Sequence, residues 1–584
     1  MEKLNLGNIF FEQNDLDHIE KCLSNYFGQN IGNFIHQLSV VKLHKTEYLF
    51  HENDPADDMY VLISGKLHVI VSSSEKPIAH INIGECVGET ALLQKGLRTA
   101  SIRAARDSTL IKISENNFKN LYAQHPDVII QLSNTIIDRL NKKNKNLHEK
   151  ANFCKVIALM DIGGNLHADI KEYFIQYWSS KFRIGRFNSS YFENNSATKS
   201  ELQLYHLEQK CDFIFMLSTQ NEQWNNWIMN NCDHAYYVGK EDDTVRFELL
   251  NTSAATDNNF LVLTYNENES PTNVEQWLPH FGAEKIFKCQ TTNQLHLDRI
   301  ARIIAGKPIC LILGGGGAKG FAHLGVLKAL NEANIPIDIV GGTSFGAIIA
   351  GAVSQDWTYA EIEDKVRADI SQSNPLSDYT FPFVSLVRGN KMEKLCKKHF
   401  NIKIENTWKN FFCVASNLST QNIEVFLAGN MDTSIAASAS IPGVLPPKLV
   451  HEELLVDGGI MHNVPVDIMR NYFQGYNITI DLNKAKIRKI KEIYHLNNQQ
   501  YFKRLLGIDK KYVPSVISVI MQSITLGSNN KQQQMQELSD IYINPEIKHG
   551  LLDWKSMNQI LKIGYDEMKH VLQNESLPEL LELP

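Results

Sequence analysis

The sequence predicts a multidomain protein of mixed β and α/β class, and three observations lead to this prediction. At 584 residues the chain is too long for a single hydrophobic core, so several domains are expected. Short β-like runs separated by turns occupy residues 41–113, which is typical of an antiparallel β-roll. Farther along, apolar runs of strand length alternate with helical periodicity, which is typical of mostly parallel sheets flanked by helices.

Four segments follow from these patterns. Residues 1–150 are predicted to form the β-roll with its helices, and residues 151–306 a small α/β domain. Residues 307–484 are predicted to form a larger α/β domain with a mostly parallel sheet. Residues 485–584 are helical in pattern, and we expect them to pack on the preceding domain as an extension.

Composition narrows the class of protein. A formal net charge of −7 argues against a nucleic-acid-binding protein. The nine cysteines include no C-x-x-C pair, so they predict reduced thiols of a cytoplasmic protein, with neither a disulfide framework nor a metal site. The first residues form no apolar stretch and no run reaches the length of a membrane span. Neither a signal peptide nor a transmembrane segment is therefore expected.

The first segment contains a cluster suited to a phosphate group. Its residues are Gly88, Glu89, Thr90 and Ala91, which indicate a one-turn helix, followed by Arg98 and Thr99. Helix amides and the Arg98 guanidinium could bind one phosphate together, because the planar guanidinium donates to two oxygens at once. Glu89 could accept a hydrogen bond from a sugar hydroxyl. These residues are therefore a candidate site for a phosphate group.

The second segment carries no comparable motif. Its strand-like runs are Val156–Met160, Phe213–Leu217 and Phe260–Thr264, separated by polar and helical stretches. It contains no phosphate loop, metal cluster or nucleophile motif. We interpret residues 151–306 as a linker domain.

The third segment opens with a strand, a glycine turn and a helix. The apolar run Ile309–Leu313 precedes the turn Gly314–Gly320, and residues 321–330 have helical periodicity. This arrangement points several backbone N–H groups at one spot, which favours negative charge. Lys319 is not followed by serine or threonine, which excludes a Walker A loop. A dinucleotide fingerprint is disfavoured because Asp338 begins the next strand instead of ending it.

One strand later, Gly342-x-Ser344-x-Gly346 has the form of a nucleophile elbow. The flanking glycines let the strand and the following helix approach closely. Ser344 would then lie at the helix N-terminus, at the carboxyl edge of a parallel sheet. The position of the motif one strand after an anion-binding turn indicates acyl-transfer chemistry, with Ser344 as the candidate nucleophile.

A serine nucleophile needs a base, and the sequence offers two kinds. Asp457 ends an apolar run and is followed by Gly458 and Gly459, so its carboxylate could take the Ser344 proton directly. A triad that uses His462 or His451 stays open as the alternative.

The glycine turn Gly314–Gly320, the serine motif Gly342–Gly346 and the segment Asp457–Gly459 resemble the three signature motifs of patatin-like phospholipases. The resemblance implies a Ser344–Asp457 dyad without histidine, an oxyanion hole from Gly315, Gly316 and Gly317, and no catalytic cofactor or metal. The supporting motif residues are Gly314, Lys319, Gly320, Gly342, Gly346, Gly458 and Gly459. The segment order resembles the neuropathy target esterase branch, which implies phospholipase A or lysophospholipase activity on phospholipid or lysophospholipid at a membrane surface.

Residues 50–65 and 88–99 similarly resemble a cyclic-nucleotide-binding domain. That resemblance implies cAMP or cGMP as a regulatory ligand, and a β-roll without ligand remains the other interpretation. For the whole chain, a nucleotide-responsive lipid-binding regulator with an inactive hydrolase fold is the alternative to an enzyme. A basic segment at residues 484–491 is a candidate for peripheral membrane contact.

Overall fold

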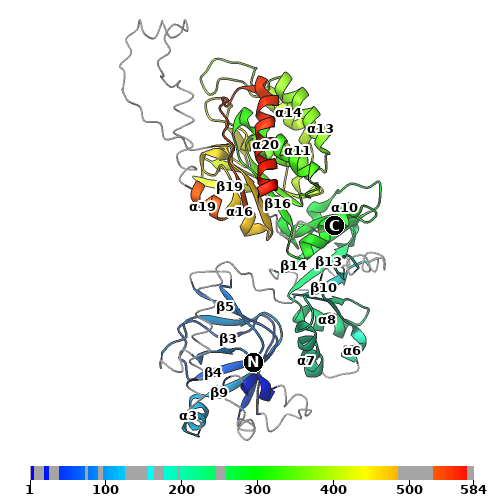
Figure 1. Cartoon of the computed structure of the whole chain (residues 1–584), viewed down its shortest axis with the longest axis vertical. Helices are drawn as coiled ribbons and strands as arrows, with labels where there is room; N and C mark the ends of the chain where they lie inside the picture. Colours follow the sequence, from blue (N-terminus) through cyan, green and yellow to red (C-terminus); the bar gives the residue numbers. More distant parts are fainter. Residues whose placement is uncertain are drawn as a thin grey trace. The chain divides into compact units, whose positions relative to one another are not determined.

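The structure is a computed structural model of the chain (Figure 1). It forms two compact units, one of residues 1–239 with 245–261 and one of residues 240–244 with 262–584. The described residues are 2–5, 19–24, 26, 38–72, 77–89, 96–124, 130, 155–163, 176–179, 182–193, 197–244, 258–483 and 531–574. The predicted basic segment 484–491 lies outside these ranges. The fold class is confirmed in both units, and the four-segment division remains a prediction.

The first unit begins with two antiparallel sheets that form the β-roll. One sheet has the order β1 (Glu2–Asn5), β2 (Ser39–Leu43), β9 (Ser108–Ser114), β4 (Asp58–Ser64) and β7 (Cys86–Val87). The other has the order β3 (Tyr48–Phe50), β8 (Ser101–Ala104), β5 (Leu67–Ile70) and β6 (Ala79–Ile81). Side chains of alternating residues, such as Leu62 and Leu110, fill a shared core. Helix α3 (Glu115–Gln124) follows.

The part of the first unit that was predicted to be a small α/β domain contains a parallel sheet. Its order is β11 (Ile184–Phe187), β12 (Phe213–Leu217), β10 (Lys155–Asp161) and β13 (His234–Gly239). The accompanying helices are α6 (Ser189–Glu193), α7 (Ala197–Glu208) and α8 (Glu222–Asn231). Strand β14 (Asn259–Tyr265), also predicted, is shared between the units.

A buried cluster of ion pairs connects the β-roll to this parallel sheet. Arg106 is 2% exposed, and its guanidinium binds the carboxylates of Asp233 and Glu208. The Asp233 carboxylate also accepts the Val156 amide, which starts β10. Moving the two parts of the unit apart would leave a buried charge without its partners, which is costly. The ion pairs therefore favour one arrangement of these two parts.

The second unit is built on a mostly parallel sheet. Its parallel strands are β18 (Asn410–Asn417), β17 (Ile339–Thr343), β16 (Ile309–Leu313), β22 (Tyr476–Ile480) and β23 (Ile541–Ile543), in that order. Antiparallel β19 (Asn422–Phe426), β21 (Glu453–Asp457) and β20 (Lys448–Val450) extend the β18 side. Because β16 and β17 are parallel neighbours, the glycine turn and Ser344 emerge at the same edge.

Helices flank this sheet. They are α10 (Gln294–Ile304), α11 (Phe321–Glu332), α12 (Phe345–Ser354), α13 (Tyr359–Val366), π-helix η8 (Arg367–Gln372), α14 (Asn390–Phe400), α15 (Met431–Ser438), α16 (Val466–Tyr472), α19 (Gln532–Glu537) and α20 (Met557–Asn574). Strand β15 (Ile286–Gln290) precedes α10. Short 3₁₀ turns occur at Glu241–Asp243, Val274–Trp277, Ala283–Lys285, Gly317–Gly320, Ile404–Asn406, Gly458–Ile460 and Trp554–Ser556. None of the helices in the described ranges is both long and apolar enough to cross a bilayer.

Asp338 has a structural role in this unit. Its buried carboxylate accepts two hydrogen bonds from Arg302 of α10, at 2.7 and 2.9 Å, and one from the Ile309 amide at 2.8 Å. These bonds hold α10 against the start of β16. The acidic residue at position 338 therefore has a structural explanation and does not require a bound dinucleotide.

Of the predicted helical extension at residues 485–584, here called the tail, the structure describes residues 531–574; these contain helices, as predicted, and also an edge strand. Helix α20, red in Figure 1, lies along α11. Gly325 and Gly564 make this packing close, because a Cβ on Gly325 would lie 2.0 Å from Leu561 O and one on Gly564 2.1 Å from Ala322 O. Strand β23 was not expected from the helical pattern. A strand of three residues is too short to reveal its period in the sequence.

Candidate active site

Ser344 lies at the bend between β17 and α12. Its backbone has φ 55° and ψ −124°, a conformation that serine seldom adopts, and the residue is 5% exposed. Its amide donates to Ser438 Oγ at 2.9 Å, so the end of α15 helps to hold the bend. A positive φ at a buried serine between a strand and a helix is the geometry expected of a nucleophile elbow.

Two glycines make this bend possible. A Cβ on Gly342 would lie 2.6 Å from the carbonyl carbon of Gly346, and a Cβ on Gly346 would lie 2.1 Å from Leu313 O. Neither contact could be relieved by rotating a side chain, because backbone atoms make both of them. The small residues in the motif therefore bring α12 against β16 and β17.

Asp457 lies beside Ser344 although 113 residues separate them in sequence. Ser344 Oγ donates to Asp457 Oδ2 at 2.6 Å, and Asp457 Oδ1 accepts the Gly459 amide at 2.8 Å. The Asp457 amide donates to Ser440 O at 2.9 Å, which fixes the end of β21. Burial raises the Asp457 pKa to about 6, against the opposing effect of the two hydrogen bonds it accepts. Such a carboxyl group is suited to exchange a proton near neutral pH.

The glycine turn faces the serine, but its amides are not equivalent. A Cβ on Gly315 would lie 3.1 Å from Ser344 Cβ, so the turn borders the nucleophile. The Gly315 amide donates to Asn463 O at 3.3 Å, and the Gly314 amide donates to Ile480 O at 2.9 Å. Within the described residues, the amides of Gly316 and Gly317 have no such acceptor. These two amides are therefore available to an oxyanion, whereas the Gly315 amide already donates to Asn463 O.

Several residues without a recognisable motif support the turn. His323, on α11, donates from Nε2 to Gly314 O at 2.8 Å, and burial lowers its pKa to about 4, so the ring is neutral. The Ala318 amide donates to Leu551 O at 2.8 Å. Trp554 packs its ring against Phe321 and Phe345.

The other glycines predicted to belong to the site are needed mainly because neighbouring atoms leave no space for a side chain. A Cβ on Gly320 would enter the Phe345 ring, and one on Gly458 would lie 2.3 Å from Val414 O. A Cβ on Gly459 would lie 3.0 Å from Asp457 Oδ1. Burial raises the pKa of the Asp481 carboxyl, and the charge of the half-buried Lys319 opposes this rise.

The two histidines weighed as alternatives do not meet the serine. His462 is buried, and its Nε2 binds Asp467 Oδ1. His451 lies exposed in the turn between β20 and β21. The geometry thus offers Asp457, and neither histidine, as the group in hydrogen-bond contact with Ser344.

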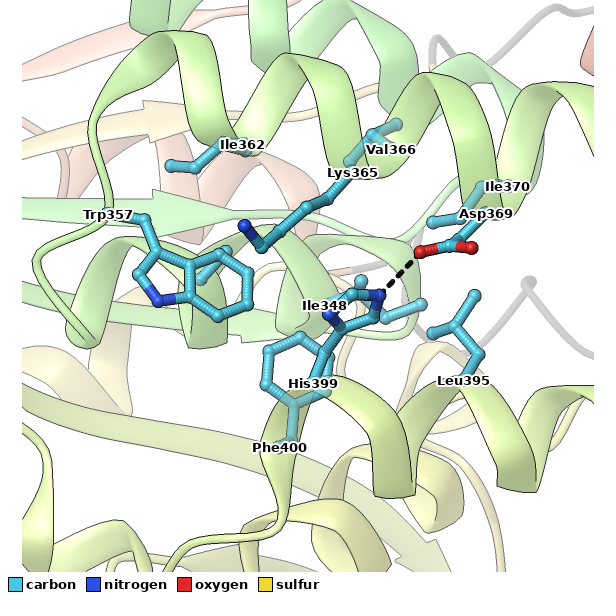
Figure 2. Close-up of a pocket in the computed structure, with 11 residues that line it drawn as sticks. Ile348, Trp357, Ile362, Lys365, Val366, Asp369, Ile370, Leu395, His399 and Phe400 are labelled. Carbon is cyan, nitrogen blue, oxygen red and sulfur yellow. Dashed lines mark hydrogen bonds and ion pairs between the residues drawn. The ribbon is translucent and has the colours of Figure 1, made fainter.

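A separate hollow, open to solvent, lies between α12, α13, η8 and α14 (Figure 2). Its lining is mostly apolar and comprises Ile348, Ala352, Trp357, Ile362, Lys365, Val366, Asp369, Ile370, Leu395, His399 and Phe400. Asp369 accepts a hydrogen bond from His399 Nε2 at 2.7 Å, and the Lys365 ammonium lies over the Trp357 ring. The predicted site residues are not part of this lining.

The predicted nucleotide site lies in the β-roll of the first unit. Arg98 is buried, with its guanidinium donating to Asp58 O at 2.8 Å and to Gly88 O at 3.3 Å, over the Phe50 ring. Gly88 has φ 83°, and a Cβ there would lie 2.4 Å from Arg98 Nη1. Arg98 Nε is buried without a hydrogen-bond partner in the described part of the chain, which fits a site built to receive an anion.

The other predicted nucleotide-site residues are described only in part. Glu89 is buried beside Gly88, and Thr99 is exposed. Thr90 and Ala91 lie outside the described residues. Among those that are described, no group of three or more His, Cys, Asp or Glu side chains could hold a metal ion.

Comparisons with known proteins agree with this arrangement. Residues 311–470 match the patatin-like phospholipase family, and residues 40–125 match the cyclic nucleotide-binding domain. An uncharacterized NTE family protein of Mycobacterium bovis is 25% identical over 557 residues, which cover 92% of each chain. Lysophospholipase nte1 of Neosartorya fischeri is 23% identical over 655 residues, a match that covers 94% of this chain and 42% of that protein.

Among solved structures, the cyclic nucleotide-binding domain from Methylobacillus flagellatus aligns at 19% identity with a TM-score of 0.21. The alignment covers 23% of this chain and 82% of that chain. The patatin-like match spans the glycine turn, Ser344 and Asp457, and the nucleotide-domain match spans the β-roll strands from β2 to β9. The chain is therefore a carboxylic ester hydrolase, in which a cyclic nucleotide-binding domain precedes a patatin-like phospholipase domain in the sequence.

Proposed function

We propose that this protein hydrolyses acyl esters of glycerophospholipids and lysophospholipids, with Ser344 as nucleophile and Asp457 as its base. The observation that carries the proposal is the 2.6 Å hydrogen bond from Ser344 Oγ to Asp457 Oδ2. Support for lysophospholipids comes from the relative named lysophospholipase nte1. The bilayer or micelle that holds such substrates implies peripheral contact with lipid.

In the first half-reaction, Asp457 accepts the hydroxyl proton as Ser344 Oγ attacks the ester carbonyl carbon. The carbonyl oxygen becomes an oxyanion, which the amides of Gly316 and Gly317 stabilise. One such donor typically contributes about 3 kcal/mol to transition-state stabilisation. As the tetrahedral intermediate collapses, the bond to the alkoxy group breaks, and protonated Asp457 returns its proton to the departing alcohol.

In the second half-reaction, water replaces the alcohol. Asp457 takes a proton from water while the water oxygen attacks the acyl-serine carbonyl. Collapse of this second intermediate releases the fatty acid, and the proton goes back to Ser344 Oγ. A single carboxyl group thus acts as base and acid in turn, which suits a pKa near 6.

A lipid-panel assay tests this proposal. The full-length protein would be incubated with phosphatidylcholine, lysophosphatidylcholine and triacylglycerol, and released fatty acid would be measured, with Ser344→Ala as the blank. We expect release from the first two substrates and covalent labelling of wild-type protein, but not Ser344→Ala, by a fluorophosphonate probe. Lipid binding without hydrolysis or labelling would instead identify a lipid-binding regulator with an inactive hydrolase fold.

We further propose that a cyclic nucleotide binds the β-roll and alters this activity. Arg98 would hold the cyclic phosphate with its guanidinium, and Glu89 would accept from the ribose. The proposal is supported by the buried Arg98 Nε, which lacks a hydrogen-bond partner in the described residues. A ligand can shift activity only if it binds two states of the protein unequally.

Calorimetry with cAMP and with cGMP tests binding in wild-type protein and in Arg98→Ala. We expect saturable binding that the substitution weakens by about tenfold or more, because it removes a charge-assisted pair. Lipid hydrolysis measured with and without saturating nucleotide then tests regulation. Binding without any change in rate would leave a nucleotide site and remove the regulatory part of the proposal.

A further inference from the structure

A short loop of the second unit exposes a continuous set of apolar side chains. Tyr379, Phe381, Phe383 and Val384 are 72%, 75%, 89% and 69% exposed, and Pro382 between them is exposed as well. Single exposed apolar residues are common on proteins. Three aromatic rings within five residues are different, because such contiguous surface usually marks a place where something binds.

The backbone holds this loop open as a hairpin-like tip. Tyr379 and Val387 form an antiparallel bridge, and the Thr380 amide donates to Leu386 O at 3.0 Å. The Arg388 amide donates to Asp378 O at 2.8 Å, which closes the base. These backbone hydrogen bonds fix the two arms of the loop, and the side chains between them are exposed in the structure.

The same loop is connected to the Ser344–Asp457 pair through one segment. The Leu386 and Val387 amides donate to Gly443 O at 2.9 Å and to Val444 O at 3.1 Å. A few residues earlier, Ser438 Oγ accepts the Ser344 amide and Ser440 O accepts the Asp457 amide. Residues 438–445 therefore contact the aromatic loop with one end and the candidate active site with the other.

The surroundings of the loop are basic. Residues 377–398 contain five basic and two acidic side chains, in a chain whose formal net charge is −7. Four of the basic residues, Lys391, Lys394, Lys397 and Lys398, are exposed on α14, and one of them, Lys398, is paired with Asp369 of η8. Glu393, one of the acidic residues, is paired with Lys448. Apolar rings flanked by lysines match a surface that has hydrocarbon beneath anionic head groups.

We propose that the loop Tyr379–Val384 inserts its side chains into the head-group region of an anionic lipid bilayer. Aromatic residues favour this water–hydrocarbon boundary, and the lysines of α14 would meet the negative head groups. A second copy of the chain fits less well, because pairing the same surface would bring two basic regions together. The inference rests on the proposed function for its consequence, which is that lipid reaches Ser344 from the side that carries this loop.

Vesicle flotation tests the inference without depending on catalysis. Full-length Ser344→Ala protein, which leaves the lipid intact, would be floated with vesicles of phosphatidylcholine, with and without phosphatidylserine. We expect binding that increases with phosphatidylserine and that falls about tenfold or more when Phe381→Ser and Phe383→Ser are combined. Leu295→Ser is the matched control, since Leu295 is 74% exposed but stands alone on α10, and it should float like the parent protein.

A second variant guards against misfolding of the first. Phe383→Trp keeps an aromatic ring, so it should still float, and its added fluorescence should be quenched by vesicles that contain brominated acyl chains. Equal flotation of the double variant and its parent would overturn the inference. So would a shift from dimer to monomer in the double variant with vesicle binding unchanged, because the loop would then be a contact between copies. If no lipid is hydrolysed yet flotation behaves as expected, the proposed function fails and this inference stands.

Discussion

Leu551 O accepts the amide hydrogen of Ala318 at 2.8 Å. This bond joins the tail to the glycine turn, although 233 residues separate the two partners in the sequence. Together with the contact of Trp554 on Phe321 and Phe345, it makes the tail part of the support for the candidate oxyanion hole.

Trp554→Ala should therefore impair both stability and turnover. We expect the free energy of unfolding to fall by about 3 kcal/mol, the usual cost of truncating a large buried ring, and kcat to fall as well because the turn loses support. Chemical denaturation and lipid hydrolysis measure the two effects. Trp227→Ala is the control, since Trp227 is also 7% exposed but belongs to the first unit. A similar loss of kcat in both variants would argue against a specific role for the tail.

Ser344→Ala and Asp457→Asn should each lower kcat by about 10³-fold or more, because the two side chains act as one catalytic group. His462→Gln should keep most of the activity, since His462 faces Asp467. Rates of fatty-acid release, normalised to folded protein, provide the measurement. Strong loss in His462→Gln with retained activity in Asp457→Asn would favour a histidine base instead.

The pH dependence of kcat/KM should report the Asp457 carboxyl group. Burial raises its pKa to about 6, and only the carboxylate can accept the serine proton. We therefore expect kcat/KM to fall as the pH drops through about 6 and to level off above it. A water-soluble ester is the appropriate substrate, because its own ionisation and packing do not change with pH. A flat profile across that range would contradict the assignment of Asp457 as base.

Asp457→Asn should also change stability, in a direction opposite to its effect on catalysis. Since the folded-state pKa is raised from 3.8 to about 6, the folded protein binds this proton more tightly than the unfolded chain. Asp457 thus lowers wild-type stability progressively as the pH rises through that interval. We therefore compare the free energy of unfolding of Asp457→Asn with that of wild type. This difference should be roughly 2–3 kcal/mol more favourable to the variant at neutral pH than at acid pH. Denaturant titrations of both proteins at both pH values provide the measurement. The same difference at the two pH values would show that folding does not raise the Asp457 pKa.

Gly317→Ala should reduce kcat by about 10²-fold with little change in KM, because an oxyanion donor would move. Gly317 has φ 54°, and a Cβ there would lie 2.3 Å from Leu551 O. Gly550→Ala is the matched control, since a Cβ on Gly550 meets nothing within 4 Å. Steady-state kinetics on a soluble ester separates kcat from KM. Equal rates in the two alanine variants would show that the turn tolerates the displacement.

The sequence could predict the parts of the site that depend on local backbone geometry. Glycines at 342 and 346 are required wherever a strand and a helix meet this closely, so the bend at Ser344 is visible as a pattern. The position of Asp457 at a strand end follows in the same way from an apolar run that is followed by glycines. Their hydrogen bond, however, is a property of the assembled sheet, in which β21 pairs with β18 and β18 with β17.

Other features could not be predicted, because they depend on contacts between distant segments. Nothing near Leu551 or Trp554 distinguishes them from ordinary apolar residues. His323 looks like any helical histidine until its ring is seen to donate to Gly314 O. Which of the three turn amides is already engaged likewise depends on Asn463, more than 140 residues away in sequence.

The crossing of Gly325 with Gly564 bears on how the protein is made. Synthesis delivers Ser344 and Asp457 well before Leu551, Trp554 and α20 emerge from the ribosome. A nascent chain could thus pair its central strands while the turn over the serine still lacks its outer support. The hydrolytic centre would then be completed only after residues 551–574 have been synthesised.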